Sequence, residues 1–190
     1  MKQEKVDSDK HYDPDFYKFA SFEIIEDYYP LIGQLATEFN SIDDALSESL
    51  SELINYNENE IGWLLISSMG FVQKVDCWEK ILYWYIHDSY LTNEKKEQEK
   101  DKVKKLAEKL KDVGAKRNKL VHADWDGMND KLLVKNKTTT SNKGVEHHYL
   151  SIDKVEFEKI IEDFYSVYNE FHIHDGEIVK LVVSIRYKKV

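Results

Sequence analysis

The chain has 190 residues, of which 42% are hydrophobic, 13% aromatic and 33% charged, and its formal net charge is -9. This length is typical of one domain, and the hydrophobic fraction is sufficient for a core, so we expect a single folded domain rather than a disordered chain. The negative charge argues against a protein that coats nucleic acid by neutralising many phosphates, but it permits contacts with a few phosphates at a local basic site.

The cysteine content and the apolar segments bear on the location of the protein. Cys77 is the only cysteine, so no internal disulfide can form, and we interpret this residue as an inert core position. The N-terminal segment does not resemble a signal peptide, and no apolar run approaches the roughly 18 residues of a membrane-spanning helix. We therefore expect a soluble, cytoplasmic protein without membrane contact.

The first half of the chain predicts two helices after a polar start. Residues 1–15 are polar and predict a disordered or frayed N-terminus, and the helical bundle domain is expected over residues 16–175. Apolar residues at helical spacing predict an amphipathic helix over 30–54. Residues 61–90 are apolar around most of a helical circumference, which is typical of a helix that is central in its domain or that also faces a second subunit.

The second half begins with a long charged helix. This helix is expected to start near Thr92, to continue through Val121 and to stop near Asp126-Gly127. Two β-prone segments then flank a polar turn region and predict a β-hairpin at about residues 131–150.

The C-terminal part predicts one more helix and an undecided tail. Ser151-Ile152-Asp153 offers a cap for a final amphipathic helix that runs to about His172. The tail, residues 176–190, is predicted to be either a strand or a short helix. The fold class is therefore mainly all-α, an antiparallel four-helix bundle with the hairpin inserted before the last helix.

One arginine stands out because it falls on the apolar face of the charged helix. The inward stripe of this helix is defined by residues that recur at helical spacing, which are Val103, Leu106, Leu110 and Val113. Arg117 continues this stripe. Burying a guanidinium is costly unless an acid or a bound anion pairs with it, so the sequence predicts a partner for Arg117.

Asn118 and His122 lie beside this arginine. They are four residues apart and share one edge of the helix. On a straight helix His122 lies about 140° around from Arg117, so the two side chains are expected to flank a patch rather than to touch. Arginine, amide and imidazole together predict an anion clamp with a proton-transfer group. A structural alternative is that Arg117 pairs with Asp76 or Glu79, and that His122 is a histidine favoured by the helix C-terminus.

The motif Arg117-Asn118-x-x-x-His122, late in a helix of a small bundle and followed by the aromatic Trp125, resembles the signature of the HEPN superfamily. The likeness of the bundle covers residues 30–175, and the six residues of the motif carry the specific match. The resemblance implies a metal-independent endoribonuclease, commonly dimeric, with two copies of the motif facing each other. Many relatives serve in toxin–antitoxin or phage-defence systems, and others act as nucleotide-binding partners.

The resemblance also implies a role for each motif residue. His122 would handle the proton of the attacking 2′-hydroxyl or of the leaving oxygen, Arg117 would stabilise the charged phosphate, and Asn118 would orient His122 or the phosphate. The implied partners are RNA, a second copy of the chain, and an antitoxin or another protein; no cofactor or metal is implied. Asp124 stands where a toxin subgroup carries a modifiable tyrosine, so control by nucleotidylation of that tyrosine is not expected.

Two other hypotheses stay open beside the ribonuclease. One is a non-catalytic helical module of the same shape that binds a protein partner or a nucleotide. The other is a purely structural helical homodimer. The sequence alone does not decide among the three.

Two further clusters are set aside. Adjacent strand residues point to opposite faces, so His147 and His148 cannot chelate one ion, and His172 with His174 at a helix end would supply only part of a metal site. The tryptophans and tyrosines of residues 63–90 are interpreted as core or interface rather than as a base-stacking platform.

Overall fold

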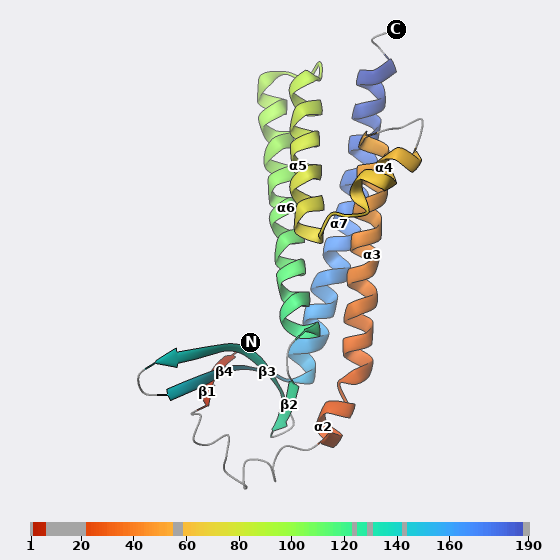
Figure 1. Cartoon of the computed structure of the whole chain (residues 1–190). Helices are drawn as coiled ribbons and strands as arrows, with labels where there is room; N and C mark the ends of the chain where they lie inside the picture. The colour runs from red at the N-terminus through yellow and green to blue at the C-terminus, as the bar shows by residue number, and fades with distance from the viewer. Residues whose placement is uncertain are drawn as a thin grey trace. The chain divides into compact units, whose positions relative to one another are not determined.

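The computed structural model describes residues 2–6, 22–54, 59–122, 125–128, 131–141 and 144–187 (Figure 1). As predicted, the chain is mainly helical. The helices in chain order are α2 (Phe22–Glu26), α3 (Tyr29–Ile54), α4 (Asn59–Ile66), α5 (Phe71–Asp88), α6 (Asn93–Val121) and α7 (Lys154–Tyr187). The strands are β1 (Lys2–Val6), β2 (Trp125–Met128), β3 (Lys131–Ser141) and β4 (Gly144–Ile152).

The chain divides into two compact units. Unit 1 comprises Met1–Thr37 and Ala115–Asp163, and unit 2 comprises Glu38–Gly114 and Phe164–Val190. The strands belong to unit 1, whereas α3, α6 and α7 contribute residues to both units.

Unit 2 is a helical bundle in which segments of α3, α5, α6 and α7 lie side by side (Figure 1). Trp78 of α5 is completely buried in its core. Its ring centroid lies 5.5 Å from that of Phe171 on α7, and its Nε1 donates a hydrogen bond of 3.2 Å to Ser49 Oγ on α3. One large side chain therefore joins three helices, with its single polar atom satisfied.

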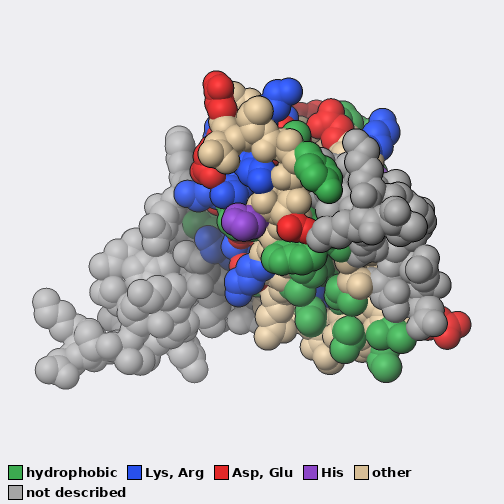
Figure 2. All heavy atoms as spheres, turned by 90° about the horizontal axis from the view of Figure 1, so that it is seen from above, with side chains coloured by type: hydrophobic (Ala, Val, Ile, Leu, Met, Phe, Trp, Pro, Cys, Tyr) green, Lys and Arg blue, Asp and Glu red, His purple; other side chains and the backbone are tan. Residues whose placement is uncertain are grey.

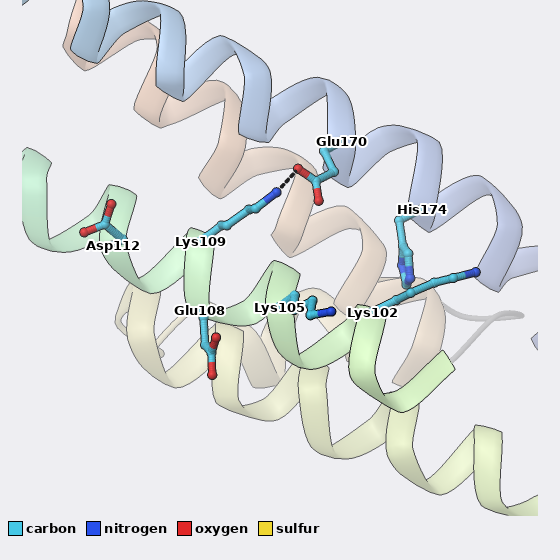
Figure 3. A pocket seen from close by; sticks show the side chains of 7 residues that line it. All are labelled: Lys102, Lys105, Glu108, Lys109, Asp112, Glu170 and His174. Carbon is cyan, nitrogen blue, oxygen red and sulfur yellow. Dashed lines mark hydrogen bonds and ion pairs between the residues drawn. The ribbon is translucent and has the colours of Figure 1, made fainter. Parts of the chain in front are cut away.

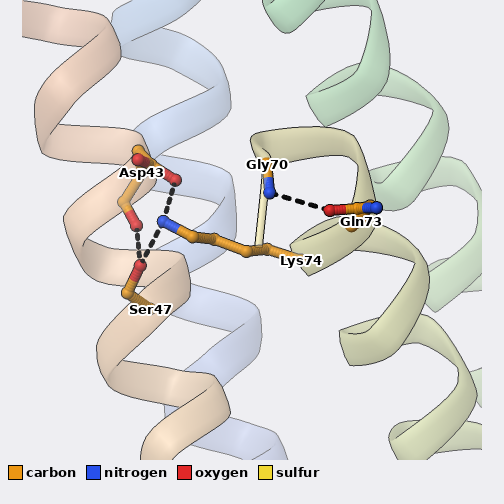
Figure 4. A network of polar contacts seen from close by, with 5 residues as sticks. All are labelled: Asp43, Ser47, Gly70, Gln73 and Lys74. Atoms are coloured by element: carbon orange, nitrogen blue, oxygen red, sulfur yellow. Dashed lines mark hydrogen bonds and ion pairs between the residues drawn. The ribbon is translucent and has the colours of Figure 1, made fainter. Parts of the chain in front are cut away.

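A partly buried ion pair links α3 to α5 (Figure 4). Lys74 Nζ donates to Asp43 Oδ1 at 2.8 Å and to Ser47 Oγ at 2.9 Å, and the Lys74 side chain is only 12% exposed. Removing one partner would leave the other charge poorly solvated, so this contact favours a single register of the two helices.

The prediction of one helix over 61–90 is wrong, because two helices, α4 and α5, occupy this region. Ser67 Oγ donates to the Leu64 carbonyl at 2.9 Å, and Gly70 N donates to Gln73 Oε1 at 2.9 Å as α5 begins (Figure 4). Serine hydroxyls compete with the helical hydrogen bonds, and glycine adopts non-helical backbone easily. The Ser67–Gly70 segment therefore interrupts an apolar pattern that is otherwise continuous.

Helix α4 packs closely on α3 through a glycine. Gly62 and Ile66 are buried, whereas the outer side chains of α4 are exposed, with Leu64 at 74%. The exposed apolar residues of α4 are Ile61, Trp63, Leu64 and Leu65. Figure 2 shows hydrophobic side chains gathered on the lower part of the described surface, with Lys, Arg, Asp and Glu side chains mixed around them.

Unit 1 contains a four-stranded antiparallel sheet in the order β1-β4-β3-β2. The two segments of the predicted hairpin form β3 and β4, which pair from Leu132 opposite Ile152 to Ser141 opposite Gly144. Lys2–Val6, which the sequence predicts to be frayed, forms β1 instead, because β4 offers its open edge for pairing. Residues 7–21 lie outside the described residues.

The sheet of unit 1 is connected to its helices through Tyr28. This buried tyrosine donates from its hydroxyl to the Ile152 carbonyl at 3.1 Å, and its ring lies edge-on to Phe157 of α7 with centroids 6.0 Å apart. The predicted cap of α7 is confirmed at Asp153, whose Oδ1 accepts a hydrogen bond of 2.8 Å from Glu156 N.

Helix α7 is longer than predicted. The expectation that it ends near His172 and that residues 176–190 form a separate strand or short helix is wrong, because α7 continues to Tyr187. Ile178 and Val182 are buried and continue the helical spacing from Phe171 and His174. The burial of these β-branched residues outweighs their small intrinsic cost in a helix.

The close approach of α4 to α3 yields a stability prediction. A Cβ added at Gly62 would lie 2.7 Å from Ser51 Cα and 2.7 Å from its carbonyl oxygen, so α4 would have to move. We expect Gly62→Ala to lower the free energy of unfolding by about 1–3 kcal/mol, measured by urea denaturation. Gly176→Ala on α7, where nothing lies within 4 Å, is the matched control and should leave stability equal or slightly higher. Equal stability of the two variants would contradict the tight packing of α4.

Candidate functional site

Helix α6 ends at Val121, immediately before His122. The prediction that it reaches Asp126-Gly127 is wrong, since β2 begins at Trp125. Trp125 Nε1 donates a hydrogen bond of 2.7 Å to the Leu120 carbonyl. The last carbonyls of a helix have no intrahelical partner, and the indole satisfies one of them.

The three predicted motif residues come together in unit 1. Arg117 Nη1 lies 2.5 Å from His122 Nε2 and donates to Asn118 Oδ1 at 3.2 Å. Asn118 and His122 are exposed, whereas Arg117 is partly buried. The expectation that Arg117 and His122 do not touch is wrong, because His122 lies beyond the helix and no longer follows its angular spacing.

The contact between Arg117 and His122 determines the state of the imidazole. A guanidinium remains protonated in proteins and has no acceptor atom, so Nη1 must donate. Nε2 of His122 must therefore accept with its lone pair, which places the proton of the neutral ring on Nδ1. In this arrangement the lone pair of a potential general base points at a cation.

The charges around the motif are mixed. Lys116 Nζ lies 3.4 Å from Asp163 Oδ2, and Lys119 is exposed on the same turn of α6. The C-terminal end of a helix carries a partial negative charge, roughly half an elementary charge, which disfavours a bound anion. The full charge of Arg117 must outweigh this effect if a phosphate is to bind.

The carboxylates proposed as alternative partners of Arg117 are engaged within unit 2. Lys111 Nζ lies 2.7 Å from Asp76 Oδ1 and 3.4 Å from Glu79 Oε2. Its hydrogen bond lowers the pKa of Asp76. In the structure these two acids therefore bind the lysine that precedes Arg117 by six positions on α6.

A hollow on the surface of unit 2 has balanced charges. It has a volume of about 540 Å³ and lies between α6 and α7 (Figure 3). Its lining combines three lysines with three acids and one histidine, which are Lys102, Lys105, Lys109, Glu108, Asp112, Glu170 and His174. Lys109 Nζ is already bound to Glu170 Oε2 at 2.6 Å. The size falls within the range of small-molecule sites, but the balanced charge selects no class of ligand.

His174 is unusual among the residues that line this hollow because it is buried. It is only 9% exposed and points from α7 toward α6 (Figure 3). Among the described residues, neither of its ring nitrogens has a hydrogen-bond partner. Burial lowers the pKa of His174, against the opposing effect of Glu99, so the ring is neutral at pH 7.

Other sequence-predicted clusters have mixed outcomes. His172 is exposed and His174 is buried, and both lie within α7 rather than at its end. The side chains of His147 and His148 lie outside the described residues, as does Asp124. Within the part of the chain that the structure describes, no three His, Cys, Asp or Glu side chains are placed to hold a metal ion.

Cys77 differs from expectation, whereas the aromatic residues divide between the core and the surface. Cys77 is partly exposed rather than in the core, and burial raises the pKa of its thiol. Trp78 and Tyr85 are buried as predicted. Trp84 and other aromatic residues of the same region lie on the surface of unit 2, and those more than two-fifths exposed are Trp63, Trp84 and Tyr90.

Two residues were not predicted to matter locally. From the sequence, Trp125 is only an aromatic that follows the motif, whereas in the structure its indole caps α6. On the sequence alone, His174 is considered only as a metal ligand, although its spacing from Phe171 and Ile178 places it on the buried face of α7. That spacing is the signal available in the sequence.

No protein-family model, curated protein or solved structure matches this chain. In the described residues, no helix combines the length and apolarity that a membrane crossing requires.

The buried imidazole of His174 yields a pH prediction. Its pKa is lowered in the folded state, so at pH values just below 6.5 the unfolded chain binds a proton that the folded chain does not. Stability therefore falls as the pH drops from 6.5 toward the folded-state pKa. Asp175 has the opposite effect at lower pH, because burial raises its pKa and the folded state then binds the extra proton.

We expect His174→Leu to remove the part of this pH dependence that lies just below 6.5, measured by urea denaturation at a series of pH values. The exposed His172→Leu is the matched control and should keep the wild-type dependence. The charged groups around His174 that remain in the variant are Glu99, Lys102, Asp175 and Glu177. An unchanged pH profile in His174→Leu would show that the ring is not buried as a neutral group.

Proposed function

We propose that this chain is a HEPN-type, metal-independent endoribonuclease that functions in a toxin–antitoxin or phage-defence system. The observation that carries the proposal is the direct contact of Arg117 with His122 at an exposed helix end. RNA cleavage by an internal hydroxyl needs a fixed cation and an imidazole that accepts a proton, and here these two groups touch.

The roles follow from the chemistry of the two side chains. A phosphate oxygen replaces His122 Nε2 as the acceptor for Arg117, which exposes the lone pair of the imidazole. His122 then takes the proton of the 2′-hydroxyl, and the 2′-oxygen attacks phosphorus. The bond to the 5′-oxygen breaks, and that oxygen takes a proton from a protonated imidazole, which on this proposal is His122 of a second copy of the chain. Arg117 stabilises the negative charge that develops on the phosphorus oxygens.

Asn118 and a second copy of the chain complete the proposed site. The Asn118 amide accepts from Arg117 at 3.2 Å and so limits the orientations of the guanidinium. Each copy of the motif carries one imidazole, whereas the reaction has one proton to remove and one to supply. A homodimer with two motifs facing each other would provide both histidines at once.

The outer face of α4 supports a second candidate, a module that binds a protein partner. Four apolar side chains of this short helix are exposed together, which is uncommon on a protein surface without a partner. An antitoxin or another protein would cover this face, and the motif would then serve as a contact within unit 1 rather than as a catalytic site.

A cleavage assay in EDTA tests the ribonuclease. We expect His122→Ala to lower kcat/KM on single-stranded RNA by about 10²–10⁴-fold, because the proton-transfer group is lost. Arg117→Ala should lower it by about 10²–10³-fold through the loss of charge stabilisation.

Lys119→Ala is the matched control, since it removes an exposed cation from the same turn of α6 without touching the contact. It should retain activity within a fewfold of wild type. Cleavage that persists at the wild-type rate in His122→Ala would remove His122 from the mechanism, and no cleavage by the wild-type protein would favour the partner-binding module.

A further inference from the structure

We infer that Trp125 is a positioning residue that holds His122 against Arg117. The inference rests on the proposed function for its meaning in catalysis, but its structural content is independent of RNA cleavage. It begins from the hydrogen bond of 2.7 Å that Trp125 Nε1 donates to the Leu120 carbonyl, two residues before His122.

This bond takes the place of a continuing helix. In an α-helix a carbonyl accepts from the amide four residues later, and one more turn would engage the Leu120 carbonyl in that way. Here the Leu120 carbonyl accepts a hydrogen bond from the Trp125 indole instead. On a straight helix, Arg117 and His122 would be separated by about 140°, so their contact depends on the chain leaving the helix at Val121.

Both partners of the bond are fixed within unit 1. The Leu120 side chain is almost completely buried, and Trp125 is paired in the sheet opposite Val134, which is also completely buried. Trp125 itself is partly buried. The bond therefore joins two anchored points, and His122 lies on the chain between them.

The consequence for the imidazole is specific. While His122 is held beside Arg117, Nη1 donates to Nε2 and the ring proton stays on Nδ1. Without the indole hydrogen bond, the chain after Val121 gains freedom, and the ring leaves the guanidinium for part of the time. The ring then exchanges between its two neutral tautomers. A merely structural tryptophan would affect stability without changing this proton position.

The test compares two changes at position 125. Trp125→Phe removes the N–H and shortens the ring, whereas 3-benzothienylalanine at the same position retains the bicyclic shape and lacks only the N–H. The long-range ¹H–¹⁵N spectrum of the histidine rings, with His122 assigned from His122→Ala, reports which nitrogen carries the proton. In wild type we expect Nδ1 of His122 to be protonated, and in both variants we expect a mixture of tautomers.

Trp84→Phe is the matched control, because Trp84 lies exposed on unit 2, and it should leave the spectrum unchanged.

Cleavage of RNA is the second readout. A displacement of about 1 Å at a reacting group can cost about 10²-fold, so kcat should fall by roughly that factor in both variants while KM changes little. An unchanged His122 spectrum in the benzothienylalanine protein overturns the inference, even if Trp125→Phe fails to fold. If the wild-type protein cleaves no RNA but the two variants show the spectral change, the ribonuclease is overturned and the positioning role of Trp125 stays intact.

Discussion

The position at which α6 ends determines whether Arg117 and His122 can meet. A helix that continued by one more turn would hold the two side chains far apart around its axis. Instead the helix stops at Val121, and the Trp125 indole donates a hydrogen bond to the Leu120 carbonyl. The His122 side chain then contacts the guanidinium of Arg117. The chemistry proposed for this chain therefore depends on one backbone carbonyl that accepts a side-chain hydrogen bond.

The charges around the motif disfavour the binding of a phosphate, whereas Arg117 favours it. The chain carries a net charge of -9, and the C-terminal end of α6 adds a partial negative charge near His122. Arg117 lies partly buried among these charges, where a guanidinium contact is stronger than on an open surface. Under the proposed function, binding of RNA would therefore depend mainly on the contact of its phosphate with Arg117.

The sequence allowed the helical class, α3 and the cap at Asp153 to be predicted, because each depends on local spacing or on one side chain. The break at Ser67–Gly70 was missed, since apolar residues on both sides of it continue the same pattern. The continuation of α7 to Tyr187 was missed because β-branched residues favour strands when they are considered without their burial.

The contact of Arg117 with His122 could not be predicted from helical spacing at all. It follows from the end of α6, where the Leu120 carbonyl accepts a hydrogen bond from a residue in a strand. Pairings of this kind arise from tertiary structure, as does the addition of β1 to the sheet. Local patterns identify which residue types are present, whereas the place where a helix stops decides which of them touch.

The most direct measurement is a crystal structure of the chain with a non-cleavable RNA dinucleotide that carries a 2′-O-methyl group at the scissile position. We expect the scissile phosphate to lie between the two side chains, with one oxygen accepting from Arg117 and the 2′-oxygen facing His122 Nε2. A structure in which Arg117 and His122 remain in contact with each other, and the phosphate binds elsewhere, would contradict this expectation.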